Sequence, residues 1–69
     1  MERVPVSSSN VASIGYDADS STLEIEFHNG SVYQYFDVGQ RLYDELKNSD
    51  SIGAFLAANI KGNYRFSKV

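Results

Sequence analysis

Glu24 and Glu26 are the residues whose type and spacing come closest to catalytic chemistry. In a strand they would share one face, about 7 Å apart at roughly 3.4 Å per residue. Two carboxylates at such a separation serve as acid and base in many glycosidases. A chain of 69 residues leaves little room for a substrate cleft, so we interpret the pair as part of a solvated strand face. The sequence therefore predicts no catalytic residues and no enzyme.

His28 and the segment 17–21 are weaker candidates. His28 is the only histidine in the sequence, and no nucleophile or orienting acid accompanies it. The segment 17–21 (DADSS) is rich in oxygen atoms, but it lacks the turn glycine and the distal glutamate of a calcium loop. We interpret it as a turn. The sequence predicts neither a metal site nor a cofactor.

The remaining functional pattern combines aromatic and basic residues: Tyr33, Tyr35, Tyr64 and Phe66 with Lys61, Arg65 and Lys68. Aromatic rings stack on unpaired bases, and basic side chains meet phosphates. The candidate nucleic-acid-binding residues are Tyr33, Tyr35, Lys61, Arg65 and Lys68. The competing interpretation is that the aromatic rings fill the core, because a domain of this length buries only about 60% of its unfolded surface.

The segment 22–37 (TLEIEFHNGSVYQYFD) positions both tyrosines. Apolar and polar residues alternate before Asn29-Gly30, which is a strong hairpin signal. A two-residue turn would pair Ile25 with Gln34 and leave both tyrosines in solvent. A three-residue loop with Gly30 at a left-handed bulge would pair Ile25 with Tyr33, which turns both tyrosines toward the core and Gln34 outward. We favour the bulged loop, because the other register buries an unpaired amide.

The other elements frame this hairpin. We expect a strand over 11–17, with Ala12, Ile14 and Tyr16 on one face and Val11, Ser13 and Gly15 on the other. The i, i+4 spacing of Val38, Leu42 and Leu46 predicts a helix over 38–47 with Asp37 as its N-cap. A second helix is predicted over 51–60, capped by Ser49 or Asp50.

These elements predict a small α+β fold. Residues 1–10 are expected to form a mobile lead-in, and residues 11–69 a single domain. The domain would hold a three-stranded antiparallel sheet in β-β-β-α-α order, two short helices packed on it and an extended C-terminal tail over 63–69.

Charge and composition limit the partners. Residues 1–50 carry all nine acids and three bases, a balance of −6, whereas residues 51–69 carry three bases and no acid. An anionic partner would therefore meet the C-terminal segment. The sequence has no cysteine, no apolar run of membrane-spanning length and no signal-peptide pattern, so we expect a cytoplasmic protein without a membrane partner.

Several weak motifs follow one another in a characteristic order. They are Ser8-Ser9, 14–17 (IGYD), 22–27 (TLEIEF), Asn29-Gly30, Tyr33-Gln34-Tyr35, Val38, Tyr43, Ser51, Gly53, Phe55, Ile60, Gly62 and Tyr64. In this order, over residues 8–69, the chain resembles a KTSC domain. That family is named from the C-terminal domain of some lysyl-tRNA synthetases and also occurs as short bacterial and phage proteins.

The resemblance implies an uncharacterised binding module, with RNA suggested by the synthetase context. Two departures bear on this. Gly39-Gln40 stands where such domains often carry proline, which loosens the helix start, and 55–60 (FLAANI) replaces a more polar and basic segment. The alternative function is a protein-interaction or structural module that uses an exposed sheet edge or the face carrying Val32 and Phe36.

Overall fold

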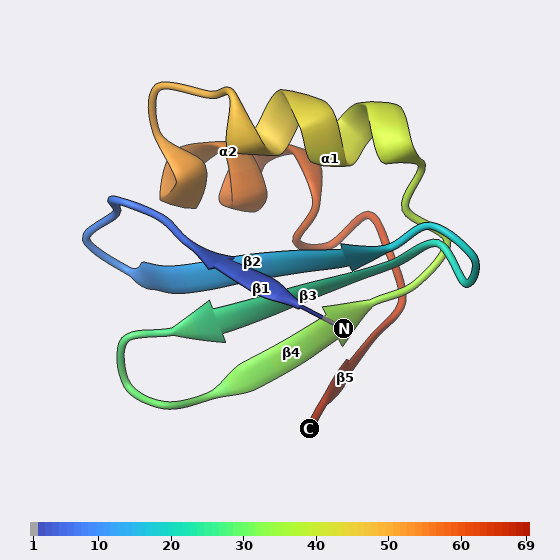
Figure 1. Ribbon diagram of the computed structural model, residues 1–69, viewed down its shortest axis with the longest axis horizontal. Helices are drawn as coiled ribbons and strands as arrows, with labels where there is room; N and C mark the ends of the chain where they lie inside the picture. The colour runs from blue at the N-terminus through green and yellow to red at the C-terminus, as the bar shows by residue number, and fades with distance from the viewer. Residues whose placement is uncertain (1) are drawn as a thin grey trace.

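Two helices lie on one face of a five-stranded antiparallel sheet (Figure 1). The computed structural model describes residues 2–69, and Met1 lies outside the described residues. The strands follow one another across the sheet in chain order. In sequence the elements are β1 (Arg3–Pro5), β2 (Val11–Asp17), β3 (Thr22–Phe27), β4 (Val32–Tyr35), α1 (Gln40–Lys47), α2 (Ile52–Asn59) and β5 (Phe66–Lys68).

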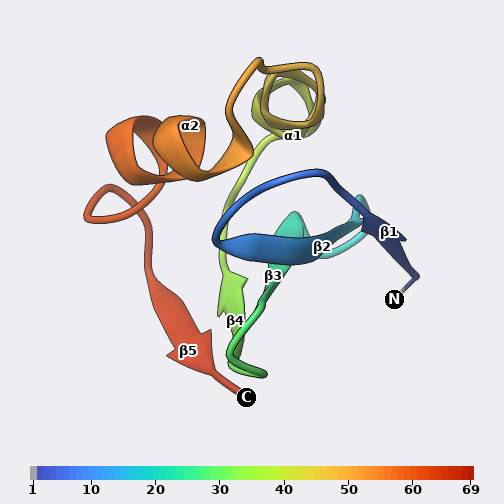
Figure 2. The same cartoon turned by 90° about the vertical axis from the view of Figure 1, so that its left-hand side faces the viewer.

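The predicted α+β class with two helices is confirmed, but the predicted three-stranded sheet is wrong. The two further strands, β1 and β5, form its opposite edges (Figure 2). β1 lies within the segment expected to be a lead-in and pairs with β2, and β5 lies within the expected tail and pairs with β4. Each has three residues, which is too short for an alternating pattern to show.

The hairpin adopts the bulged register. Ile25 pairs with Tyr33, and Leu23 pairs with Tyr35. The amide of Phe27 donates to the carbonyl of Ser31 at 2.8 Å, and the amide of Gly30 donates to the carbonyl of Phe27 at 3.0 Å. Gly30 has a φ of +90°, which the left-handed position of such a loop requires.

The outer face of the sheet carries the paired carboxylates. Gln34 lies opposite Glu24 and donates through its Nε2 to Glu24 Oε1 at 2.9 Å. Arg3 Nη1 lies 3.4 Å from Glu24 Oε2, and Ser13 Oγ donates to Glu26 Oε1 at 2.8 Å. Both carboxylates therefore bind neighbouring side chains on the face that the helices leave uncovered.

The face predicted for Val11 is wrong. The β2–β3 register shifts between Val11 and Ser13, so Val11 lies opposite Phe27 and is fully buried. An irregularity of this kind adds a residue to one strand and reverses the alternation beyond it. Val11 consequently joins Ile14 in the core.

Both helix starts differ from the predicted ones. α1 is capped by Gly39, which makes no side-chain bond, and Asp37 instead has a φ of +61° and binds Arg65. α2 is capped by Ser51, whose Oγ accepts from the amide of Ala54 at 3.3 Å. Ser49, a predicted cap, donates through its Oγ to the carbonyl of Leu46. α1 therefore begins two residues later than predicted, and α2 begins one residue later.

The core lies between the helices and the central strands. Val38 and Leu46 of the predicted apolar stripe are fully buried, and Leu42 packs against them from a partly buried position. The ring of Tyr43 stacks on that of Tyr16 with centroids 4.9 Å apart. These contacts place α1 over β2 and leave α2 on the side toward β5 (Figure 2).

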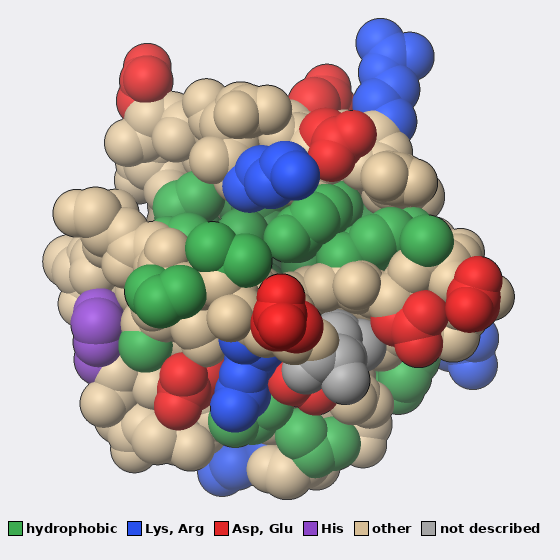
Figure 3. Space-filling model, viewed as in Figure 1, with side chains coloured by type: hydrophobic (Ala, Val, Ile, Leu, Met, Phe, Trp, Pro, Cys, Tyr) green, Lys and Arg blue, Asp and Glu red, His purple; other side chains and the backbone are tan. Residues whose placement is uncertain are grey.

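A band of apolar side chains follows the seam between the helices and the sheet (Figure 3). A hollow of about 340 Å³ lies there between β1 and α1, and Val4, Ile14 and Tyr43 contribute to its lining. Neither helix of the described chain has the length and apolar character needed to cross a membrane.

Candidate functional site

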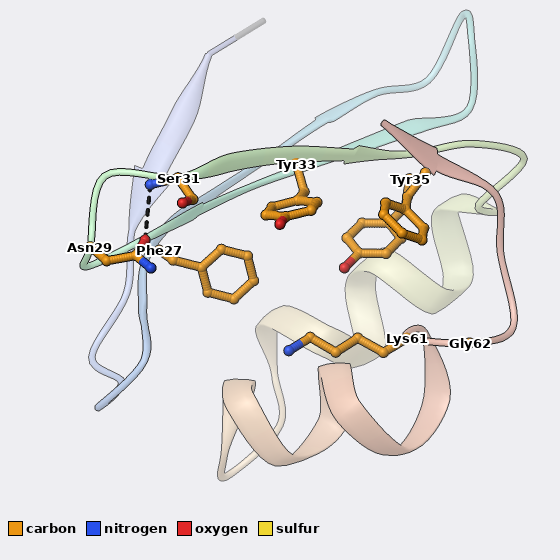
Figure 4. A pocket seen from close by; sticks show the side chains of 8 residues that line it. Phe27, Asn29, Ser31, Tyr33, Tyr35, Lys61 and Gly62 are labelled. Atoms are coloured by element: carbon orange, nitrogen blue, oxygen red, sulfur yellow. Dashed lines mark hydrogen bonds between the residues drawn. The ribbon is translucent and has the colours of Figure 1, made fainter. Parts of the chain in front are cut away.

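A pocket of about 430 Å³ lies between the β3–β4 hairpin, β5 and the turn after α2. Figure 4 shows Tyr33 and Tyr35 pointing from β4 toward the end of α2. The lining comes from the hairpin, the turn after α2 and the edge strand β5: Phe27, Asn29, Ser31, Tyr33, Tyr35, Lys61, Gly62 and Phe66.

Four aromatic rings form one wall of the pocket. Phe27 and Tyr33 meet edge to face, with centroids 5.7 Å apart and planes at 85°. The ring of Phe66 lies 5.8 Å from both Tyr33 and Tyr35. The strand pairing explains the cluster, because residues opposite each other in an antiparallel sheet share a face and Tyr35 lies opposite Phe66.

Lys61 supplies positive charge to the pocket. Helix α2 ends at Asn59 with Ile60 as its C-cap, the amide of Lys61 donates to the carbonyl of Leu56, and Gly62 turns the chain with a φ of +83°. This turn places the Lys61 ammonium 5.3 Å from the centroid of the Phe27 ring, a cation–π contact. Among the described residues, no acidic side chain lines the pocket.

Polar groups of the hairpin loop close the far end. Asn29 Oδ1 accepts a hydrogen bond from the amide of Ser31 at 2.9 Å, and this bond fixes the loop at the pocket rim. The pocket therefore offers planar apolar surfaces, one cation and neutral polar groups. Such a lining suits a planar group attached to an anion.

The structure brings three of the five predicted site residues together. Tyr33, Tyr35 and Lys61 line the pocket, and Lys68 lies opposite Tyr33 in the sheet. Arg65 lies elsewhere: its guanidinium binds Asp37 at 2.8 Å and lies 5.9 Å from the ring of Phe36.

Tyr33 and Tyr35 both pack with the hydrophobic core and line the pocket. Tyr35 is 4% exposed, and Tyr33 is partly buried against the core, yet both contribute to the pocket lining. Burial raises the pKa of the Tyr35 hydroxyl above its ordinary value, and the neighbouring Tyr33 adds to the rise.

Phe27 and Phe66 complete the aromatic wall. Phe27 is missing from the predicted aromatic and basic pattern, and Phe66 belongs to that pattern but not to the five candidate residues. The alternation of β3 correctly places Phe27 on the face of Ile25, but it does not show that Phe27 is only partly buried and lines a pocket. Phe66 is 59% exposed on the edge strand, and its neighbours Tyr33 and Tyr35 lie more than 30 positions earlier in the chain.

Comparisons with known proteins give one family. The family model of the KTSC domain matches residues 7–64. A KTSC domain protein from Yersinia pestis has a crystal structure that superposes with a TM-score of 0.94 at 42% identity, covering 99% of this chain and 96% of that one.

Similar sequences occur in two settings. An uncharacterized protein of Stutzerimonas stutzeri is 34% identical over 100% of this chain and 99% of its own length. A lysine–tRNA ligase of Trichormus variabilis is 37% identical over 78% of this chain, and the match covers only 10% of that ligase. The match to the family model over most of the chain, with these relatives and this fold, shows that the chain belongs to the KTSC domain family.

Proposed function

We propose that this chain is a small, non-enzymatic, cytoplasmic module that binds unpaired RNA at the aromatic pocket. One observation carries the proposal: ring faces and a lysine line this pocket without an acidic residue among the described ones, in a chain of net charge −3. An acid-free, cation-bearing hollow on an acidic molecule favours an anionic partner.

The chemistry of the lining favours a nucleotide over a simple anion. An unpaired base stacks on aromatic rings, and this contact tolerates any sequence because every base has a π-face. Tyr33 and Phe66 present such rings, and Lys61 and Lys68 lie on the same side of the sheet for the attached phosphates. Recognition of a base-paired helix would need a larger basic surface.

The similarity to a lysine–tRNA ligase gives independent support for RNA as the partner. That protein acts on a tRNA, and the segment that it shares with this chain spans most of the present domain.

A titration of labelled mixed-sequence RNA decamer at low salt tests the proposal. We expect a Kd tighter than about 10⁻⁴ M, the weak limit of non-specific binding. Lys61→Gln should weaken binding about tenfold, because it removes a charge-assisted phosphate contact.

Lys47→Gln is the matched control. Lys47 also lies over an aromatic ring, 5.1 Å from the centroid of Tyr43, but it does not line the aromatic pocket. The Lys47→Gln variant should bind RNA with the same affinity as the unchanged protein. A decamer that binds no tighter than about 10⁻⁴ M, or equal losses in both variants, contradicts the proposal.

A second candidate function is self-association through the edge strand β1. Val4 is 53% exposed on that strand, beside the apolar seam, and a second copy of β1 would pair with its free edge. Sedimentation should then show a dimer that added salt leaves intact and Val4→Ser weakens. If the protein stays monomeric at high concentration, self-association is excluded. If Phe36→Ser removes the dimer and Val4→Ser does not, the contact lies on the outer face of the sheet.

A further inference from the structure

A second hollow adjoins the aromatic pocket and shares part of its wall. It has a volume of about 350 Å³. Phe27, Asn29 and Lys61 line both hollows, and Ser9, Asn10 and His28 line only the second. The two hollows are therefore neighbouring parts of one groove, with Lys61 and Phe27 at the junction.

His28 provides the second hollow with an aromatic surface of fixed orientation. Its Nε2 lies 2.8 Å from the carbonyl oxygen of Ser8. Since a carbonyl oxygen only accepts, Nε2 carries the proton and donates. The amide of His28 also donates to the carbonyl of Asn10 at 3.0 Å. Two bonds to the segment before β2 thus hold this residue beside the hollow, and a held ring loses little freedom when a ligand stacks on it.

The second hollow has the same kind of charge as the aromatic pocket. Among the described residues, no acidic side chain lines the second hollow, and Lys61 is its cation. A cation at the junction of two hollows matches the covalent order of a nucleic acid strand, in which one phosphodiester links two nucleosides.

We propose that the groove binds two consecutive unpaired nucleotides of RNA. One base stacks in the aromatic pocket on Tyr33 and Phe66, the linking phosphodiester meets the Lys61 ammonium, and the next base stacks on His28. This inference rests on the proposed function and adds to it the length of the bound segment and the second base site.

The test compares three RNA probes by chemical-shift titration: uridine 5′-monophosphate, the dinucleotide UpU and oligo-U of ten nucleotides. UpU should bind about tenfold more tightly than the mononucleotide, because one further stacked base gives an increment of this order. The decamer should gain, beyond the number of overlapping sites it offers, one further phosphate contact at Lys68, which lies opposite Tyr33. UpU should shift the amide signals of Ser9, Asn10 and His28, which the mononucleotide leaves in place.

Two variants assign the parts of the groove. His28→Ala should lower the affinity for UpU to that for the mononucleotide and leave the mononucleotide affinity unchanged. Lys61→Gln should weaken UpU about tenfold, whereas its control Lys47→Gln should not. An oligo-glutamate peptide of ten residues probes charge alone and should bind more weakly than the decamer.

The outcomes separate this inference from the proposed function. If the decamer binds while UpU and the mononucleotide have equal affinities, or while the amide signals of residues 9, 10 and 28 stay in place, the second base site is overturned and RNA binding stands. If oligo-glutamate binds as tightly as oligo-U, the groove selects anions and not nucleotides. If no RNA probe binds, both proposals fail.

Discussion

Tyr35 is a buried core residue that also contributes to the lining of the pocket. Its ring packs in the core and against Phe66, while its side chain also lines the aromatic pocket. The raised pKa of its hydroxyl follows from this position, because burial disfavours the phenolate. At this one residue, the stability of the domain and the chemistry of the site are therefore linked through pH.

Tyr35→Phe should change the alkaline stability of the domain. The folded chain holds the Tyr35 proton to a higher pH than the unfolded chain, whose tyrosine titrates near 10.0. The contribution of Tyr35 to the free energy of unfolding is therefore complete below about pH 10 and is lost as the pH rises through the folded pKa. Urea denaturation between pH 7 and 11 measures this loss.

The phenylalanine variant should match the unchanged protein at pH 7, to within about 0.5 kcal/mol, and lose less stability above pH 10. Tyr64→Phe serves as the control, since Tyr64 lies outside the pocket and only partly buried. Parallel pH curves for Tyr35→Phe and the unchanged protein would show that this hydroxyl titrates alike in both states.

At the scale of elements, the hairpin loop depends on the backbone of Gly30. A Cβ built there meets no heavy atom within 4 Å, so the φ of +90° is the main obstacle to a side chain. Gly30→Ala should lower the free energy of unfolding by about 1 kcal/mol, the cost of a left-handed conformation for a residue with a Cβ. Urea denaturation at neutral pH measures it.

Gly53→Ala is the opposite case and the matched control. Gly53 lies within α2, and a Cβ there meets Asn10 Nδ2 at 3.5 Å, an ordinary contact. This variant should be more stable by up to about 1 kcal/mol, because alanine favours the helix. Equal stability changes in the two variants would show that Gly30 does not need its left-handed conformation.

The elements divide clearly into those the sequence could predict and those it could not. The hairpin register follows from the residues because one choice buries Gln34 and the other lets it bind Glu24. The face of Val11 could not be predicted, because the register shift beside it does not change the pattern of apolar and polar residues in the sequence. The helix caps are misplaced by one or two residues. Ser49, Asp50 and Ser51 all suit the cap of α2, and the cap of α1 is Gly39, which has no side chain to mark the position.

At the scale of the whole molecule, the pocket depends on contacts between distant segments. Lys61 reaches Phe27, and Phe66 reaches Tyr33, only because the two helices return the chain to the free edge of β4 (Figures 1 and 4). Residue types alone selected Tyr33, Tyr35 and Lys61, which the structure brings to one pocket. They could not show that Arg65 lies away from this pocket, because nothing local in the sequence indicates that Asp37 binds it.

The charge distribution of the whole molecule predicts a salt dependence for the proposed RNA binding. At the pocket, the bases that can meet phosphate are Lys61, which lines it, and Lys68, which lies opposite Tyr33, while Arg65 is paired with Asp37. A single strand loses affinity with a slope of about −0.7 per neutralised phosphate in a plot of log K against log salt concentration. Two phosphates predict a slope of about −1.4 for the decamer.

Lys61→Gln should reduce this slope to about −0.7, and Lys47→Gln should leave it unchanged. Affinities measured between about 50 and 200 mM salt determine it. A slope steeper than about −3 would require more phosphates than the groove holds and would place the RNA across a wider surface. A slope near zero would leave stacking as the entire interaction, and Lys61 would then serve only to cover Phe27.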